Sequence, residues 1–298
     1  MDSLPKPWER SDKQVMTIIR HYSFCNKYFR CRTDPSLQEL IKQLSDCEIK
    51  VTVNERGFSF DVAENSKYFD VALYVAEKAK MIEGTFEMLL FTKKYSNTEL
   101  ENADYLHIRS VYVGISPLDE YRSSYTSFEH DEHSIQVGPP IIKKHPSWHL
   151  NRHFATDYDS ATVHLFCSHT AKQIIEANQL KGAKFRDVLD LKTRQPASDV
   201  FQLFPQECAD FLSPGRYYLT GHICKICGLR RINEQDGRAE MHLNNRLIPE
   251  NVDFMQSPPV IGADAGYPYY VISNKAYRVL RDNHLTRGLV FEPLRTVS

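Results

Sequence analysis

Two cysteines three positions apart, Cys224 and Cys227, are the residues of this sequence best suited to chemistry. They stand in the stretch TGHICKICGLRR, residues 220–231, and Gly228 follows the second cysteine directly. Two thiolates on one tight turn can bind the same Zn²⁺ ion, and a glycine lets the backbone fold behind them. Because a structural zinc site has four ligands, this motif supplies half of one.

The candidates for the missing ligands are Cys208 and His222, with His242 as a third choice. A redox role is disfavoured, because a reactive Cys-x-x-Cys places its first thiol at a helix N-terminus, whereas two arginines follow the motif here. Two interpretations stay open. Either Cys224, Cys227, Cys208 and His222 hold a structural zinc ion, or the two thiols of the motif bind no metal.

Histidines gather in a polar stretch at 116–155, among them His145, His149 and His153. Their four-residue spacing would align them on one helix face, but Pro146 interrupts any such helix. No metalloprotease-type frame surrounds them. We therefore expect this stretch to be a connector, with its histidines in solvated loops.

Other residues that could act in catalysis have simpler structural interpretations. Ser168 and Ser273 each end a predicted strand and begin a predicted helix, which indicates helix caps rather than nucleophiles. The carboxylates of Asp187 and Asp190 have no partner nearby in sequence, so we expect them on a solvated surface. There is no phosphate loop, dinucleotide fingerprint or nucleophile elbow. We expect a protein that is not an enzyme.

The first part of the chain alternates predicted strands and helices. Apolar residues from Leu37 to Leu44 stand at spacings of three and four after Pro35, which predicts a helix with one buried stripe. The predicted elements are a strand at 15–24, a helix at 35–45, a hairpin at 48–62, a helix at 66–82, and strands at 85–93 and 105–115. The order β-α-β-β-α-β is that of a ferredoxin-like unit. We expect an N-terminal α+β domain at 1–115.

The last part of the chain contains an internal repeat between residues 164–185 and 269–291. Four residues of the first segment recur 105 positions later: Ser168, Ala171, Asn178 and Leu180 match Ser273, Ala276, Asn283 and Leu285. After one inserted residue, Gly182 and Phe185 match Gly288 and Phe291. Each segment predicts a strand, a capped amphipathic helix, a glycine turn and a second strand. We expect a C-terminal domain at 156–298 made of two β-α-β elements, with the Cys-x-x-Cys motif in an insertion at about 205–250.

Composition limits the classes of protein that fit. The 298 residues carry 37 Lys and Arg against 38 Asp and Glu, a net charge of −1. A generic nucleic-acid or membrane-surface binder would be clearly basic. The N-terminus has no apolar signal-peptide core, and no run of about 18 apolar residues occurs. Seven cysteines at irregular spacings fit reduced thiols better than a disulfide framework. We expect a cytoplasmic protein that contacts neither membrane nor nucleic acid.

The order of motifs in the C-terminal half resembles a known family. It runs DVFQLFPQEC, CKICGLRR, LNNRLIPENVDF and YYVISNKAYRVLRDNHLTRGLVFEPL, within residues 160–298. This order is similar to that of the double-CxxCG immunity proteins found beside bacterial polymorphic toxins. The family name counts two CxxCG motifs, and this chain has one, at Cys224 to Gly228.

The resemblance implies a non-enzymatic immunity protein that binds a cognate toxin and occludes it. It also implies that the metal site of the family is incomplete here. The alternative is a zinc-ribbon protein that binds nucleic acid or regulates transcription.

Overall fold

The structure is a computed structural model, and it describes most of the chain. The described residues are 16–26, 35–54, 57–82, 85–117, 125–128, 133–136, 138–148, 152–157, 164–207, 211–212, 217–223, 230–234, 242–244, 248–257, 260–261, 266–267 and 269–297. The fold mixes helices with several β-sheets, as expected for an α+β protein. The chain divides into two compact units, Glu9–Ser96 and Asn97–Ser298.

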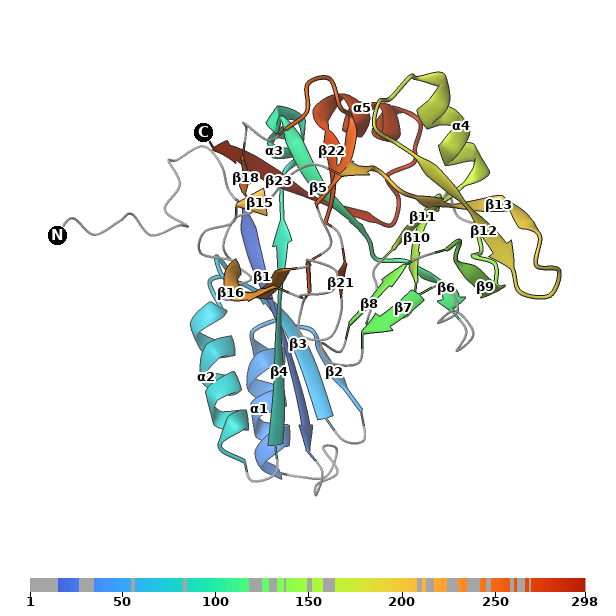
Figure 1. Cartoon of the computed structure of the whole chain (residues 1–298). Coiled ribbons are helices and arrows are strands. Elements are labelled where there is room, and N and C mark those ends of the chain that lie inside the picture. The colour runs from blue at the N-terminus through green and yellow to red at the C-terminus, as the bar shows by residue number, and fades with distance from the viewer. Residues whose placement is uncertain are drawn as a thin grey trace. The chain divides into compact units, whose positions relative to one another are not determined.

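The first unit has the element order β-α-β-β-α-β. Its sheet has four strands in the order β2 (Val51–Val53), β3 (Gly57–Ala63), β1 (Thr17–Asn26) and β4 (Thr85–Lys94), and each strand is antiparallel to its neighbours. Its two helices are α1 (Pro35–Asp46) and α2 (Phe69–Lys80). Both helices cover the same face of the sheet (Figure 1).

The core of the first unit forms where aromatic strand residues meet small and branched helix residues. Tyr22 and Phe24 of β1 stack on Phe58 and Phe60 of β3, with ring centroids 5.0 to 6.3 Å apart. Period-two alternation puts these rings on one face, and Leu44 of α1 packs there with no exposed surface. The aromatic positions of two strands therefore decide which face of the sheet the helices cover.

The second unit contains a closed six-stranded barrel. Its strands follow the order β10 (Phe154–Asp157), β11 (Leu165–Ser168), β13 (Pro196–Leu203), β12 (Phe185–Asp190), β9 (Ile141–Lys144) and β6 (Val113–Pro117). The barrel closes because β6 also pairs with β10. The helix α4 (His169–Ala177) connects β11 to β12.

A seven-stranded sheet accompanies the barrel in the second unit. Its order is β14 (Gln206–Glu207), β19 (Phe254–Gln256), β22 (Tyr270–Ser273), β5 (Tyr105–Ser110), β23 (Leu289–Val297), β18 (His242–Asn244) and β15 (Phe211–Leu212). The helix α5 (Asn274–Asp282) connects β22 to β23, and α3 (Asn97–Asn102) precedes β5.

Two smaller sheets complete the described strands. One has the order β16 (Tyr217–Ile223), β17 (Arg230–Glu234), β20 (Val260–Ile261) and β21 (Gly266–Tyr267). The other pairs β7 (Tyr125–Phe128) with β8 (His133–Gln136).

In the barrel, the two strands of the first repeated segment do not pair with each other. Instead β13 lies between β11 and β12 and is antiparallel to both. Leu165 of β11 and Phe185 of β12 both lie opposite Leu203. The helix α4 therefore crosses over the strand that separates its own two strands.

The second repeated segment has the same arrangement, with β5 between β22 and β23. Tyr270 and Phe291 both lie opposite Ile108. These two residues are the sequence counterparts of Leu165 and Phe185. The strand registers of the two segments thus agree residue for residue from Leu165 to Ser168 and from Phe185 to Asp187, although β13 follows its segment and β5 precedes its segment in the chain.

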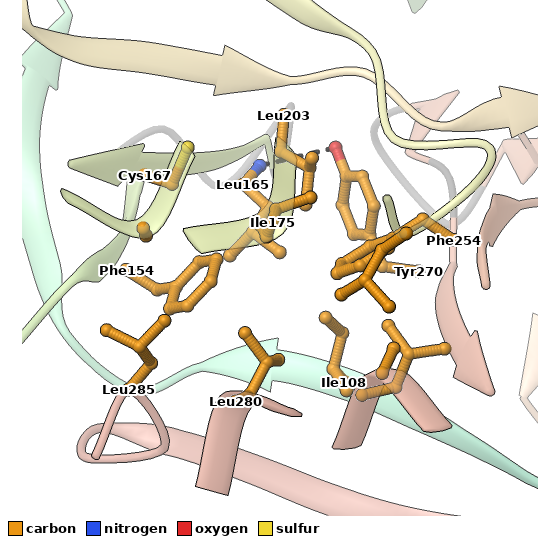
Figure 2. Close-up of a cluster of buried hydrophobic side chains, with 14 of the residues drawn as sticks. Ile108, Phe154, Leu165, Cys167, Ile175, Leu203, Phe254, Tyr270, Leu280 and Leu285 are labelled. Carbon is orange, nitrogen blue, oxygen red and sulfur yellow. Dashed lines mark hydrogen bonds between the residues drawn. The ribbon is translucent and has the colours of Figure 1, made fainter. Parts of the chain in front are cut away.

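One hydrophobic core joins the two segments (Figure 2). Ile175 of α4 and Leu280 of α5 are 1% and 0% exposed, and they occupy matching positions of the two helices. The core also takes in Phe154 of β10 and Phe254 of β19, both fully buried. Because helices of both segments contribute, neither segment buries its apolar face alone.

The helices α4 and α5 begin and end alike. The hydroxyl oxygens of Ser168 and Ser273 accept hydrogen bonds from the backbone N–H three residues later, which confirms both as N-caps. At the other end, the side-chain amides of Asn178 and Asn283 donate to the carbonyl four residues earlier. These local bonds satisfy backbone groups that the helix itself leaves unpaired.

Three expectations about organisation need correction. The first unit ends at Ser96 and not at 115, because β5 pairs with β22 and β23 of the second unit. The stretch expected to be one strand at 105–115 forms two, β5 and β6. The stretch at 116–155 is not a simple connector, because β9 and β10 are barrel strands, and Ile142 and Phe154 are fully buried there.

The expected insertion at about 205–250 also contributes strands to the seven-stranded sheet. The strands β14, β15 and β18 extend that sheet at its edges. Leu243 of β18 is 1% exposed and packs with Met255 and Leu294. The segment between the two repeated elements therefore does contribute to a core.

Candidate functional site

The expected zinc ligands fall outside what the structure describes. Cys208, Cys224 and Cys227 lie outside the described residues, and for His222 only its place in β16 is described. The flanking strands are placed: Ile223, at the end of β16, lies opposite Arg230, at the start of β17. The Cys-x-x-Cys-Gly motif thus connects two antiparallel strands.

Within the described residues, no group of three or more His, Cys, Asp or Glu side chains could hold a metal ion. His242, the third choice of ligand, begins β18 and is partly buried. Burial lowers the pKa of His242, and the positive charge of Arg295 adds a smaller decrease. Its imidazole is therefore neutral near pH 7, and it belongs to no group of three or more potential metal ligands among the described residues.

The structure instead brings His145 together with two carboxylates, Asp190 and Asp199, that lie 45 and 54 positions further along the chain. His145 follows β9, Asp190 ends β12 and Asp199 lies in β13. Nδ1 of His145 is 2.9 Å from a carboxylate oxygen of Asp199, and Nε2 is 3.0 Å from one of Asp190. The indole N–H of Trp148 donates to the backbone carbonyl of Asp199 at 3.0 Å. We call His145, Asp190 and Asp199 the histidine clasp.

The positive charge of His145 and the negative charges of the two carboxylates in the clasp stabilise each other. Partial burial of the ring lowers the pKa of His145, but hydrogen bonds and attraction from Asp190 and Asp199 together raise it by more, so the pKa lies above its usual value. The backbone N–H of Thr193 and then the ring of His145 lower the pKa of Asp190 to about 2. The arrangement favours an imidazolium ion between two carboxylates.

This geometry suits a structural tie better than acid–base catalysis. A general base needs a ring nitrogen free to accept a proton, whereas both nitrogens of His145 already have carboxylate partners. The expectation of a solvated loop for His145 and a solvated surface for Asp190 missed that the two side chains pair with each other, although both remain partly exposed. Separations of 45 and 54 residues leave no local signal from which the contacts could have been predicted.

A second histidine of the same stretch, His153, contacts the cap of α4. Its Nδ1 is 2.9 Å from the hydroxyl oxygen of Ser168, and its backbone carbonyl accepts the N–H of Ser168. Burial lowers the pKa of His153. A serine beside a neutral histidine is the geometry with which an activated nucleophile begins.

The second repeated segment shows that the pair has a structural role. There Ser273 occupies the position of Ser168, and its hydroxyl donates to Asp253 at 2.7 Å. The backbone carbonyl of Asp253 accepts the N–H of Ser273, as that of His153 does for Ser168. Since both serines cap helices and both bind the residue before an adjacent strand, His153 and Asp253 are equivalent anchors of that cap.

Two further titratable groups are buried in the barrel region and held uncharged. Burial lowers the pKa of His164 to about 3, helped by the positive charge of Arg186. Burial raises the pKa of the Cys167 thiol well above its usual value. A thiol that stays protonated is a poor nucleophile and a poor metal ligand, so Cys167 is not a reactive cysteine.

Comparisons with protein-family models, with curated proteins and with solved structures found no match. No helix among the described residues is long and apolar enough to cross a membrane. The functional conclusions below therefore rest on the residues of this chain and on the family resemblance of its C-terminal half.

Proposed function

We propose that this protein is an immunity protein, or antitoxin, that binds and neutralises a cognate bacterial toxin by occlusion and without catalysis. The observation that carries the proposal is the order of motifs within residues 160–298, which ends in S-x-x-A-x-x-x-L and G-L-x-F-E-P-L. The net charge of −1 is compatible with a protein partner rather than with a polyanion.

Within residues 273–294, the residues of the two motifs stabilise the fold, and we expect the toxin-binding residues to lie elsewhere. Ser273 caps α5, and Ala276 and Leu280 have no exposed surface. Leu294, the last motif residue, is 5% exposed. Buried residues cannot contact a partner, so we expect family members to share this segment while their exposed residues differ with the toxin.

Co-expression tests the proposal. The product of the neighbouring gene is expressed alone, with this protein, and with a variant of it that does not fold. We expect toxicity from the product alone, rescue by the intact protein, and a complex that survives purification. A harmless product, or toxicity that persists despite a stable complex, would refute the proposal.

Two finer statements about the fold belong to the same proposal. The first unit is a ferredoxin-like domain, supported by its element order and by its antiparallel strand order β2-β3-β1-β4. The elements β11-α4-β12 and β22-α5-β23 are copies of one ancestral unit, supported by their matching caps and strand registers. The solved structure of a toxin-bound relative would test both.

A structural zinc ion held by Cys224, Cys227, Cys208 and His222 is also a proposal, as is a cytoplasmic location. Metal analysis of the purified protein tests the first. A zinc-to-protein ratio near zero, with stability unchanged by a chelator, would end it.

In the alternative function, as a nucleic-acid-binding or regulatory protein, DNA or RNA affinity would fall steeply with salt. Absence of binding at low salt removes that alternative.

A further inference from the structure

The helix α2 and its C-cap residue, Met81, carry most of the exposed large apolar side chains in the described part of the chain. Leu73, Tyr74 and Met81 are 36%, 53% and 78% exposed, and Val111 is the one other such residue there. Single exposed apolar residues are ordinary, but three within nine positions form a patch that calls for an explanation.

The helix α1 provides a direct comparison, because it covers the same face of the same sheet. Its outward positions Gln38, Glu39 and Lys42 are exposed and polar. The outer side of a helix in this unit can therefore consist of polar side chains. The apolar character of α2 on its outer side is specific to that helix.

The inward side of α2 has no need of these residues. Its four inward positions are buried with no exposed surface: Ala72, Val75, Ala76 and Ala79. At 100° per residue, Tyr74 falls on the opposite side of the helix and Leu73 on its flank, and the C-cap residue Met81 follows on the side of Tyr74. The core of the unit is thus complete without them.

Charged residues on the outer side are arranged about Tyr74. Asp70 stands four residues before it and Lys78 four residues after it, and both are exposed. The ammonium group of Lys78 lies 5.5 Å from the centroid of the Tyr74 ring. Glu77 and Lys80 pair with each other at 2.9 Å. Within the described residues, Asp70 and Lys78 are then the charged side chains of this side that remain available to an outside partner.

We propose that this outer side of α2, made of Asp70, Leu73, Tyr74, Lys78 and Met81, binds the same surface of a second copy of the protein. In a twofold arrangement with antiparallel helices, the axis passes beside Tyr74. Asp70 of each copy then lies opposite Lys78 of the partner subunit, because the two residues are equally far from the axis. The apolar side chains are buried between the two helices.

The expected dimer is weak. A pair of helices of this length contributes less than the roughly 800 Å² per partner that stable complexes bury. The full-length protein should therefore be monomeric at low micromolar concentration and dimeric towards millimolar concentration in sedimentation equilibrium. A protein that stays monomeric throughout this range overturns the proposal.

Substitutions test the surface itself. We expect Tyr74→Glu to raise the dimer dissociation constant by about tenfold or more, since it places a charge at the axis. Val111→Glu, at the exposed apolar residue outside α2, is the matched control and should leave it unchanged. Thermal unfolding followed by circular dichroism shows whether each variant is folded. Equal dimerisation of Tyr74→Glu and the original protein contradicts the proposal.

Charge reversal separates a second copy from any other partner. Asp70→Lys and Lys78→Asp should each weaken self-association, because like charges then face each other across the axis. The double variant D70K/K78D restores both pairs, and so does an equimolar mixture of the two single variants. If neither the double variant nor the mixture recovers dimer, the antiparallel arrangement is wrong.

Discussion

The backbone N–H of Leu165 donates a hydrogen bond to the hydroxyl of Tyr270, with N and O 3.2 Å apart (Figure 2). The two residues begin β11 and β22, and they are counterparts in the two repeated segments. Tyr270 is 5% exposed and Leu165 is 2% exposed. A side chain of the second segment thus satisfies a buried backbone group of the first, which ties the barrel to the large sheet.

Replacement of Tyr270 with Phe should destabilise the second unit by about 1–3 kcal/mol, because the buried N–H of Leu165 loses its acceptor. Tyr277→Phe is the control, since Tyr277 is also buried but accepts no backbone N–H within the described residues. Urea unfolding followed by fluorescence gives both free energies. Equal losses for the two variants would show that the Leu165 hydrogen bond is of no consequence.

The glycines that follow α4 and α5 should differ in how they tolerate a side chain. Both have positive φ, 86° at Gly182 and 84° at Gly288, so alanine at either costs about 1–2 kcal/mol. At Gly182 an added Cβ would also lie 2.2 Å from the carbonyl oxygen of Phe254, whereas at Gly288 its nearest neighbour is 3.8 Å away. We expect Gly182→Ala to lower the thermal unfolding midpoint more than Gly288→Ala. The reverse order would contradict the close approach of Gly182 to Phe254.

The two capping serines should also differ in importance. Ser168→Ala removes a cap and the hydrogen bond between the Ser168 hydroxyl and the ring of His153, and should cost about 0.5–2 kcal/mol. Ser273→Ala removes a cap and a hydrogen bond to the carboxylate of Asp253, whose side chain is only 9% exposed. Because a hydrogen bond to a charged group is stronger than one to a neutral ring, its cost should be larger by about 1 kcal/mol or more. Native-state hydrogen exchange of the α4 and α5 amides measures each effect locally. Ser273→Thr, which keeps the hydroxyl, is the control for α5.

The histidine clasp should make stability depend on pH. The pKa of His145 is raised in the folded protein, so its contribution is complete below the unfolded pKa of about 6.5 and is lost as pH rises through the folded value. The pKa of Asp190 is lowered to about 2, so its contribution is present above the unfolded value of about 4 and is lost as pH falls towards 2.

The stability difference between the original protein and His145→Gln should therefore be largest near pH 5 to 6 and should shrink in both directions. Urea unfolding at a series of pH values measures it. His284→Gln is the control, because His284 is exposed and Gln179 already occupies the matching place in the first segment. A stability difference that stays constant with pH would mean that the clasp does not titrate with folding.

Local features could be predicted from the sequence because their causes are local. The apolar spacing from Leu37 to Leu44 predicted α1, and all of Leu37, Leu40 and Leu44 are buried. The serine caps of α4 and α5 were predicted because a hydroxyl reaches an N–H only three residues away. The matching residues of 164–185 and 269–291 could be recognised because both helices repeat the same short-range bonds.

Functional residues were harder to predict. The histidine clasp joins three strands of a closed barrel, and no spacing rule links His145 to Asp190 or Asp199. The zinc ligands expected from spacing alone stay a prediction. The sequence does not show which apolar residues of α2 are exposed. Only the packing of the inward side of the helix against the sheet shows that Leu73 and Tyr74 lie outside the core.

The sequence by itself determined where α1, α4 and α5 begin and which of their residues are apolar, because these features depend on contacts within about four residues. Only the tertiary structure decided that β5 separates β22 from β23, and that β13 separates β11 from β12. Strand pairing joins residues that are distant in the chain, such as Leu165 with Leu203 and Tyr105 with Ser273, through backbone groups that every residue carries. Local sequence therefore does not identify the partner strand. The same reason explains why the domain boundary fell at Ser96 and why Leu165 meets Tyr270.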